Sequence, residues 1–158
     1  MRRILATLAV VGAVLFSAGS AWADWDDAVA AYERGDYATA SREFLPLAEQ
    51  GNADAQFNLG IMYANGRGVP ENDAEAVKWF RKAVEQGYAE AQNNLGFMYA
   101  NGRGVPENDV KAHMWWSLAK AQGDKDAPGG LDAIKPRMTR AQIAKAQELA
   151  AEWLEKHN

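Results

Sequence analysis

The chain of 158 residues contains no cysteine and only two histidines. Without cysteine the fold cannot use disulfides or thiolate metal ligands, and thiol redox chemistry is excluded. His113 and His157 are far apart in the sequence, and neither has a second ligand at metal spacing, so no metal or cofactor is expected. Long basic runs are also absent and the formal net charge is −4, which argues against nucleic acid as a partner.

The N-terminal residues 1–23 are typical of a signal peptide. Arg2 and Arg3 precede an apolar run over residues 4–16, and Ala21-Trp22-Ala23 gives an A-x-A cleavage pattern. The run is shorter than the roughly 20 residues that a spanning helix needs. We therefore expect a periplasmic or secreted protein with no stable membrane anchor after cleavage. An uncleaved N-terminal anchor is the alternative.

A segment of 36 residues occurs twice in tandem. Residues 48–83 align with residues 84–119 without a gap, and about two-thirds of the positions are identical. The stretch YANGRGVPEND is the same in both copies, at residues 63–73 and 99–109. A period of this size is the signature of stacked helical hairpins, because one hairpin cannot bury its apolar face without neighbours.

Apolar residues within each copy recur at helical spacing on two segments. Small residues lie beside large ones, as two closely packed antiparallel helices require. In the first copy these residues are Ala55, Leu59, Gly60 and Tyr63, then Ala76, Trp79, Phe80 and Ala83; in the second they are Ala91, Leu95, Gly96 and Tyr99, then Ala112, Trp115, Trp116 and Ala119.

The shared stretch between the two helices is interpreted as a turn. Asn65-Gly66 is expected to end the first helix, Pro70 to prevent its continuation, and Asn72 or Asp73 to cap the second helix. A phosphate-binding loop is disfavoured because the preceding element is a helix and not a strand.

The sequence predicts an all-α fold, a short right-handed α-solenoid of stacked antiparallel helical hairpins with a C-terminal capping helix. Thr139 and Gln142 form a capping-box pattern at the start of that last helix. The expected divisions are a signal peptide at 1–23, a partial N-terminal hairpin at 24–51, full repeats at 52–87 and 88–123, an irregular connection at 124–138 and the capping helix at 139–158.

Three motifs follow one another in both copies: L-G-x-x-Y, G-x-G-V and A-x-x-W-aromatic-x-x-A. In these motifs the chain resembles the Sel-one-like repeat family, a branch of the tetratricopeptide-like solenoids, and in particular its secreted bacterial members. The resemblance implies a non-enzymatic adaptor or scaffold that binds a protein or peptide. Some secreted members carry a cysteine pair in each repeat, which this chain lacks.

The first helix of each repeat is expected to line the concave side of the stack. The residues of that helix that face away from the second helix mix apolar, amide and acidic groups, and the copies differ there, with Phe57 against Asn93 and Ile61 against Phe97. We interpret them either as a groove for a peptide or as packing between hairpins. They are Asp54, Phe57, Asn58, Ile61 and Asn65, then Glu90, Asn93, Asn94, Phe97 and Asn101.

Two other functions remain as alternatives. Ser117-Leu118-Ala119-Lys120 matches the S-x-x-K nucleophile signature of penicillin-binding proteins and envelope hydrolases, but the partner motifs Ser-Asp-Asn and Lys-Thr-Gly are missing. A peptidoglycan- or glycan-binding module would need exposed tryptophans, for which Trp25 and Trp153 are the candidates.

Overall fold

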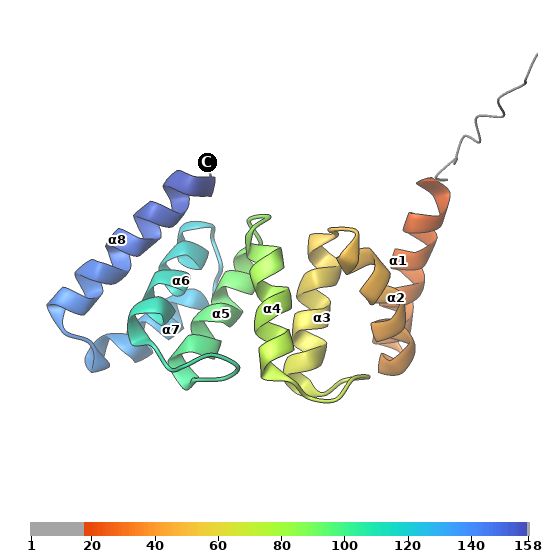
Figure 1. Cartoon of the computed structure of the whole chain (residues 1–158), viewed down its shortest axis with the longest axis horizontal. Helices are drawn as coiled ribbons and strands as arrows, with labels where there is room; N and C mark the ends of the chain where they lie inside the picture. The colour runs from red at the N-terminus through yellow and green to blue at the C-terminus, as the bar shows by residue number, and fades with distance from the viewer. Residues whose placement is uncertain (1–17, 158) are drawn as a thin grey trace, which may run out of the picture.

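The computed structural model describes residues 18–157, with side chains from Trp25 onward. This part of the chain consists of helices joined by turns and contains no strand, so the expected all-α class is confirmed. The helices are α1 (Ala18–Glu33), α2 (Tyr37–Glu49), α3 (Ala53–Asn65), α4 (Asp73–Val84), α5 (Ala89–Asn101), α6 (Asp109–Ala121), α7 (Ala127–Ile134), the short 3₁₀ helix η1 (Lys135–Arg137) and α8 (Arg140–His157) (Figure 1).

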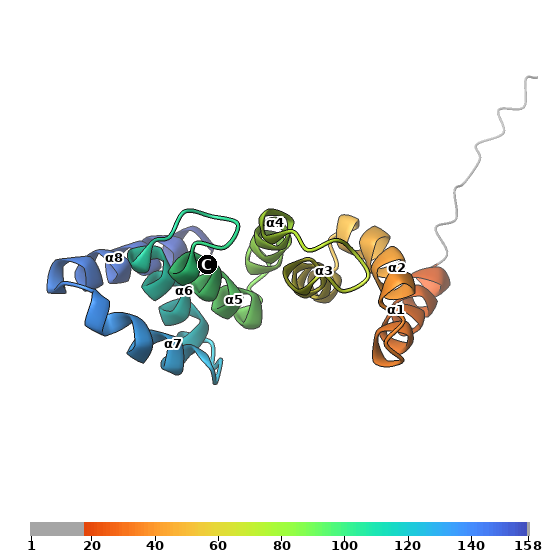
Figure 2. The same cartoon turned by 90° about the horizontal axis from the view of Figure 1, so that it is seen from below.

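The helices form a row of antiparallel hairpins. Helix α1 pairs with α2, α3 with α4 and α5 with α6, and each second helix also packs against the first helix of the next hairpin. Figure 2 shows α1, α3, α5 and α7 along one side of the row and α2, α4, α6 and α8 along the other. We call these the first-helix side and the second-helix side.

Within each full repeat, a glycine lets the two helices cross closely. A Cβ atom on Gly60 would lie 2.5 Å from the Phe80 ring, and one on Gly96 would lie 2.6 Å from the Trp116 ring. Leu59 and Leu95, the neighbours of these glycines, are almost fully buried. The small residues therefore lie at the crossing, as the sequence predicts.

The repeated stretch forms the predicted turn in both copies. Gly66 and Gly102 end α3 and α5 with left-handed φ angles of 61° and 62°. The side chain of Asn72 then accepts a hydrogen bond from the Glu75 N–H at 3.1 Å, which caps α4. Asn108 caps α6 in the same way, through the Lys111 N–H at 2.9 Å.

The segment 124–138, expected to be irregular, instead contains α7 and η1, so that expectation is wrong. Ala127, Leu131 and Ile134 follow helical spacing, and all three are buried. The Asp124 carboxylate accepts from the Ala127 N–H at 2.8 Å and starts the helix. The helix forms because its apolar stripe packs against α6.

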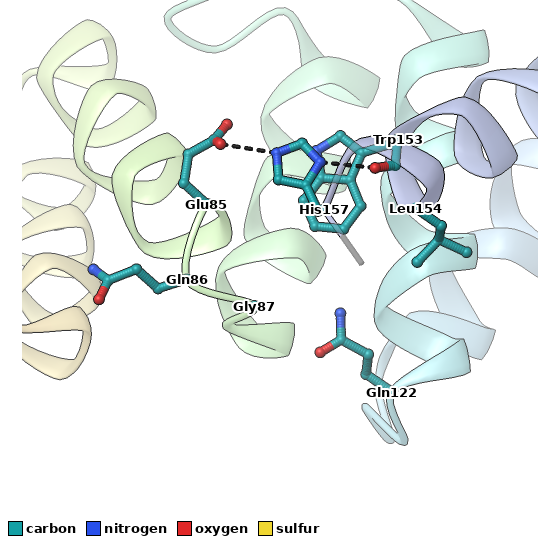
Figure 3. Close-up of a pocket in the computed structure, with 7 residues that line it drawn as sticks. All are labelled: Glu85, Gln86, Gly87, Gln122, Trp153, Leu154 and His157. Carbon is teal, nitrogen blue, oxygen red and sulfur yellow. Dashed lines mark hydrogen bonds and ion pairs between the residues drawn. The ribbon is translucent and has the colours of Figure 1, made fainter.

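Helix α8 covers the second-helix side of α6, as expected of a capping helix. The predicted capping box is present, since the Thr139 N–H donates to the Gln142 side chain at 2.8 Å. At its other end the His157 ring stacks on Trp153, and its Nε2 lies 2.9 Å from a carboxylate oxygen of Glu85 (Figure 3). These contacts connect the last turn of α8 to the α4–α5 turn, beside a hollow of about 430 Å³.

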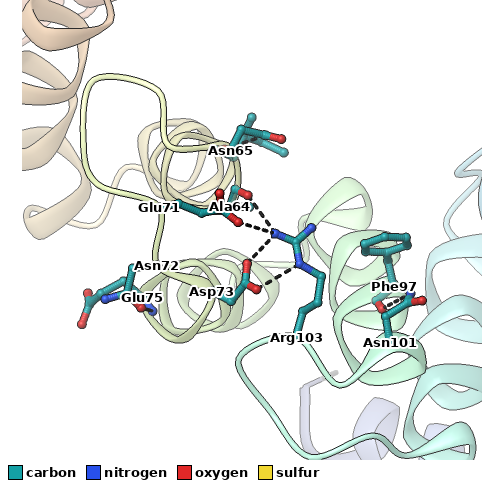
Figure 4. Close-up of polar contacts among 10 residues, drawn as sticks. Ala64, Asn65, Glu71, Asn72, Asp73, Glu75, Phe97, Asn101 and Arg103 are labelled. Atoms are coloured by element: carbon teal, nitrogen blue, oxygen red, sulfur yellow. Dashed lines mark hydrogen bonds and ion pairs between the residues drawn. The ribbon is translucent and has the colours of Figure 1, made fainter.

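The arginine of each repeated turn reaches back to the preceding hairpin. Arg103 donates to both carboxylate oxygens of Asp73, at 3.0 and 2.6 Å, and to the Ala64 carbonyl at 2.9 Å (Figure 4). A further bond of 3.3 Å joins it to Glu71. The Asp73 carboxylate raises the pKa of Arg103. The turn thus fixes one hairpin against the next.

Equivalent contacts exist at both ends of the row. Arg137 in η1 binds Glu107 and Asp109, which are the counterparts of Glu71 and Asp73 one period later. Towards the N-terminus, Arg67 donates to the Tyr32 hydroxyl at 3.0 Å and lies over the Tyr37 ring. Helix α7 with η1 and α8 is therefore a degenerate third repeat.

Most of the expected signal peptide, including its apolar run, lies outside the described residues. Helix α1 begins at Ala18, so the expected cleavage point after Ala23 lies within a helix of the full-length chain. None of the described helices is both long enough and apolar enough to cross a membrane.

Candidate functional site

The ten residues predicted to line a groove all lie on α3 or α5, the first helices of the two full repeats. They differ in exposure. Asp54, Asn65, Glu90, Phe97 and Asn101 are exposed, whereas Phe57, Asn58, Ile61, Asn93 and Asn94 are half-buried. The ten residues therefore do not form one uniform surface.

Phe57 and Ile61 pack between the hairpins. The Phe57 ring stacks on Tyr88 with 5.0 Å between the ring centroids, and it lies 6.0 Å from the Phe80 ring. Ile61 packs against the same cluster, which holds Val84 and Leu95. For these two positions the structure supports packing over a groove.

Phe97 is the exception, since 47% of its surface is exposed. It lies at the edge of a depression of about 290 Å³ between α5, α6 and α7, which we call the Phe97 depression. Figure 4 shows Phe97 and Asn101 on α5, directed away from the ion pairs of Arg103. The lining residues are Asn93, Asn94, Phe97, Trp116, Asp126 and Gly130.

Three of these lining residues were not predicted from the sequence, namely Trp116 at the base, Asp126 and Gly130. The last two were missed because the segment 124–138 was expected to be irregular. Extending the 36-residue period would have found them, since Ala127 and Leu131 fall one period after Ala91 and Leu95. Gly130 is required here because a Cβ atom would overlap the Trp116 ring.

Four asparagines on this side share one geometry. The amide nitrogen of each donates to the carbonyl oxygen four residues earlier, at 2.8 Å in every case. An amide group has two N–H donors and one carbonyl acceptor, so each side chain retains capacity for one donor and one acceptor bond. These residues are Asn58 and Asn65 on α3, with Asn94 and Asn101 on α5.

The charged groups on the first-helix side are mainly acidic. Asp54 accepts a hydrogen bond from the Tyr88 hydroxyl at 2.8 Å. Burial, followed by this bond, raises the pKa of Tyr88, so its hydroxyl stays protonated and donates. Glu90 on α5 and Asp126 at the start of α7 are both exposed. None of the six lining residues of the Phe97 depression is basic.

The Ser117 hydroxyl lies 3.2 Å from Nδ1 of His113, one helical turn away on α6. Burial and the charge of Lys135 lower the pKa of His113, which favours a neutral imidazole. In a nucleophilic triad a third polar group would orient the histidine. Within the described residues, no carboxylate forms a hydrogen bond with His113 that could orient its ring in this way.

Tryptophans do not form an exposed platform on the described part of the chain. Trp25 packs near Phe44 with 5.5 Å between the ring centroids, and Trp153 meets Trp115 edge-on at 5.9 Å. Between Trp25 and His157, no group of three or more His, Asp or Glu side chains is placed to hold a metal ion.

Comparison with known proteins agrees with this architecture. The Sel1 repeat family model matches residues 53–88 and 89–124, which cover α3 to α6. No curated protein matches the chain. Sel1 repeats generally mediate protein–protein interaction, and proteins built from them are generally non-catalytic scaffolds.

The chain is also similar to solved structures, of which two are described. One is a protective antigen of uropathogenic Escherichia coli strains with an SLR fold: TM-score 0.81, 29% identity, covering 88% of this chain and 31% of that chain. The other is a Sel1 repeat protein from Oxalobacter formigenes: TM-score 0.64, 33% identity, covering 74% of this chain and 51% of that chain. This chain thus spans about a third and a half of their lengths. Residues 53–124 thus consist of two Sel1 repeats in the solenoid arrangement of these structures.

Proposed function

We propose that this protein is an exported, non-enzymatic scaffold that binds a peptide segment of a partner protein along the first-helix side, with the Phe97 depression as its anchor point. The observation that carries the proposal is the exposure of Phe97 beside an open depression, whereas Ile61, its counterpart one period earlier, packs between the hairpins. Exposed aromatic residues next to a pocket are typical of binding surfaces.

The polar groups around the depression favour an extended peptide. Asn94 and Asn101 are two helical turns apart, or about 10 Å along α5. This distance matches about three residues of an extended peptide. The free donor and acceptor of each amide can then bond to peptide N–H and C=O groups, as asparagine chemistry allows.

The charge of this side selects the type of partner. Glu90 and Asp126 are acidic, and the chain as a whole carries a formal charge of −4. Loss of the expected signal peptide would also remove Arg2 and Arg3 and make the protein more acidic. A peptide with one apolar side chain for the depression and a flanking lysine or arginine would complement this surface.

Selection from a displayed peptide library tests the proposal. We expect selected peptides to share an apolar residue next to a basic one, with affinities measurable by fluorescence polarisation. Phe97→Ala should weaken their binding by about tenfold or more, since an aromatic anchor dominates such interfaces. The matched control is Leu45→Ala, because Leu45 is also exposed but lies on α2, on the second-helix side.

The outcomes separate clearly. Equal binding by wild type and Phe97→Ala, with unchanged helicity by circular dichroism, would place the binding surface elsewhere. Loss of helicity in Phe97→Ala would instead identify Phe97 as a core residue.

The hydrolase alternative has a separate test with a fluorescent β-lactam. Covalent labelling of the wild-type protein that is lost in Ser117→Ala would support the hydrolase and overturn the scaffold.

A further inference from the structure

A second hollow lies at the C-terminal end of the row, between α6, α7, η1 and α8. Its volume is about 410 Å³, within the range of small-molecule sites. Leu131 of α7 and Ile143 of α8 form apolar walls, and Lys120 of α6 and Lys135 of η1 lie at its margin. We call it the α6–α8 hollow. It shares no lining residue with the Phe97 depression.

The charge of this hollow differs from that of the rest of the protein. The other hollows described above each include at least one carboxylate, Glu85 in one and Asp126 in the other. The α6–α8 hollow has two lysines and no carboxylate among its lining residues. Among the described residues, Lys135 forms an ion pair with Asp132, with 3.5 Å between Nζ and Oδ1. The Asp132 side chain is 79% exposed and is not a lining residue of the hollow. Solvent weakens such an exposed pair, so much of the lysine charge remains for a ligand.

The interior of the hollow also supplies a hydrogen-bond donor. His113 is 4% exposed, and its Nδ1 lies 3.2 Å from the Ser117 hydroxyl. If Nδ1 accepts the Ser117 proton, the Nε2–H of the neutral imidazole is free to donate. If Nδ1 is protonated and donates to Ser117, the hydroxyl proton is free instead. The pair therefore retains one donor in either tautomer.

We propose that the α6–α8 hollow binds a carboxylate that carries a short apolar chain. The lysines and the donor of the His113–Ser117 pair would bind the carboxylate, and Leu131 and Ile143 would pack on the chain. A carboxylate on a hydrocarbon chain fits better than inorganic phosphate, because Leu131 and Ile143 offer apolar contacts that phosphate cannot use. The carboxylate belongs either to a free alkyl acid or to the C-terminal residue of a peptide.

Titration of the ¹⁵N-labelled protein with octanoate tests the site, with the amides of Ser117, Leu131 and Ile143 as reporters. We expect saturable shifts at these amides. Octanol has the same chain without the charge, and inorganic phosphate has charge without a chain, so each should bind at least about tenfold more weakly. Lys135→Gln should weaken octanoate binding, and the double variant with Lys120→Gln should weaken it further.

The matched control is Lys145→Gln, since Lys145 lies on α8, which lines the hollow, but pairs with Glu148 and is not a lining residue. It should leave octanoate binding unchanged. The peptide Gly-Gly-Leu, with a free or an amidated C-terminus, distinguishes the two sources of the carboxylate. If only the free form binds, and binds more tightly than octanoate, the ligand is a peptide C-terminus. If octanoate binds more tightly than the free peptide, the ligand is an alkyl acid. The proposal is overturned if octanol or phosphate binds as tightly as octanoate, if Lys145→Gln has the effect of Lys135→Gln, or if neither carboxylate shifts the reporters.

Discussion

Gly96 shows how a single hydrogen atom determines the spacing of two helices. A Cβ atom at this position would lie 2.6 Å from Nε1 of Trp116, an indole that is 6% exposed and held between α5 and α7. We therefore expect Gly96→Ala to destabilise the protein by about 1–3 kcal/mol, the usual cost of overpacking a closed core. Urea unfolding followed by circular dichroism measures the change.

Gly129 provides the control for that variant. It lies in helix α7 and does not have a positive φ angle, and a Cβ atom added to it would meet no atom within 4 Å. Gly129→Ala should be neutral or stabilise the protein by up to about 1 kcal/mol, because alanine favours the helix. If both variants lowered stability equally, close packing would not be the reason for Gly96.

His157 gives the last turn of α8 a dependence on pH. The Trp153 carbonyl and then the Glu85 carboxylate raise the pKa of His157 above its ordinary value. The stabilising contribution of the protonated ring is complete below that ordinary value and is lost as the pH rises through the raised pKa. Glu85→Gln should lower the pKa of His157 in an NMR titration and leave His113 unchanged. An unchanged His157 value would contradict the ion pair.

The different roles of Phe57 and Phe97 mark the limit of residue-level prediction. The sequence places both side chains on the face directed away from the partner helix, but the Phe57 ring also lies 6.0 Å from the ring of Phe80 on that helix. Tyr88 of the following unit covers Phe57, whereas Phe97, which is the counterpart of Ile61, lies at the edge of the depression beside α7. The exposure of each position therefore depends on the unit that follows it. An alignment of two repeats alone does not contain that information.

At the scale of the elements, the repeated turns act as connectors between hairpins. Arg103 bonds to Asp73, Glu71 and the Ala64 carbonyl, so Arg103→Ala leaves several acceptors without a partner. We expect a loss of about 1–2 kcal/mol in urea unfolding, reduced at high salt, and faster amide exchange at the α4–α5 interface.

Arg42→Ala is the control for the connector, because the Arg42 side chain is 73% exposed and its ion pair within the described residues is with the adjacent Glu43. Its effect should stay within about 0.5 kcal/mol. Similar small effects of both substitutions would mean that the turn geometry alone, and not the arginine contacts, fixes the hairpins.

The two full repeats were predictable because their period, glycines and caps all favour the same structure. Helix α7 was not predicted, because Pro128, Gly129 and Gly130 are poor helix formers. Tertiary packing overrides that preference: proline is acceptable in a first turn, and Gly130 allows a close approach to Trp116. The apolar stripe of Ala127, Leu131 and Ile134 was the available signal.

For the whole molecule, both proposed sites depend on the degenerate third repeat. The Phe97 depression lies between α5, α6 and α7, and the α6–α8 hollow lies between α6, α7 and α8. In a solenoid each unit contacts mainly its neighbours. Apart from the contact of His157 with Glu85, the final unit packs chiefly on α5 and α6, so it can diverge with little effect on the earlier units. The two regular repeats determine how the helices stack, and the divergent last unit leaves the Phe97 depression and the α6–α8 hollow open.

Export of the whole chain gives the final prediction. With the A-x-A pattern at Ala21 to Ala23, expression of the full chain with a C-terminal tag in a Gram-negative host should yield a periplasmic protein that begins at Asp24. Intact-mass spectrometry of the periplasmic fraction measures this. Ala21→Glu combined with Ala23→Glu should block cleavage, because the cleavage site requires small residues. Wild-type protein that remained full-length would contradict a cleaved signal and favour the uncleaved anchor.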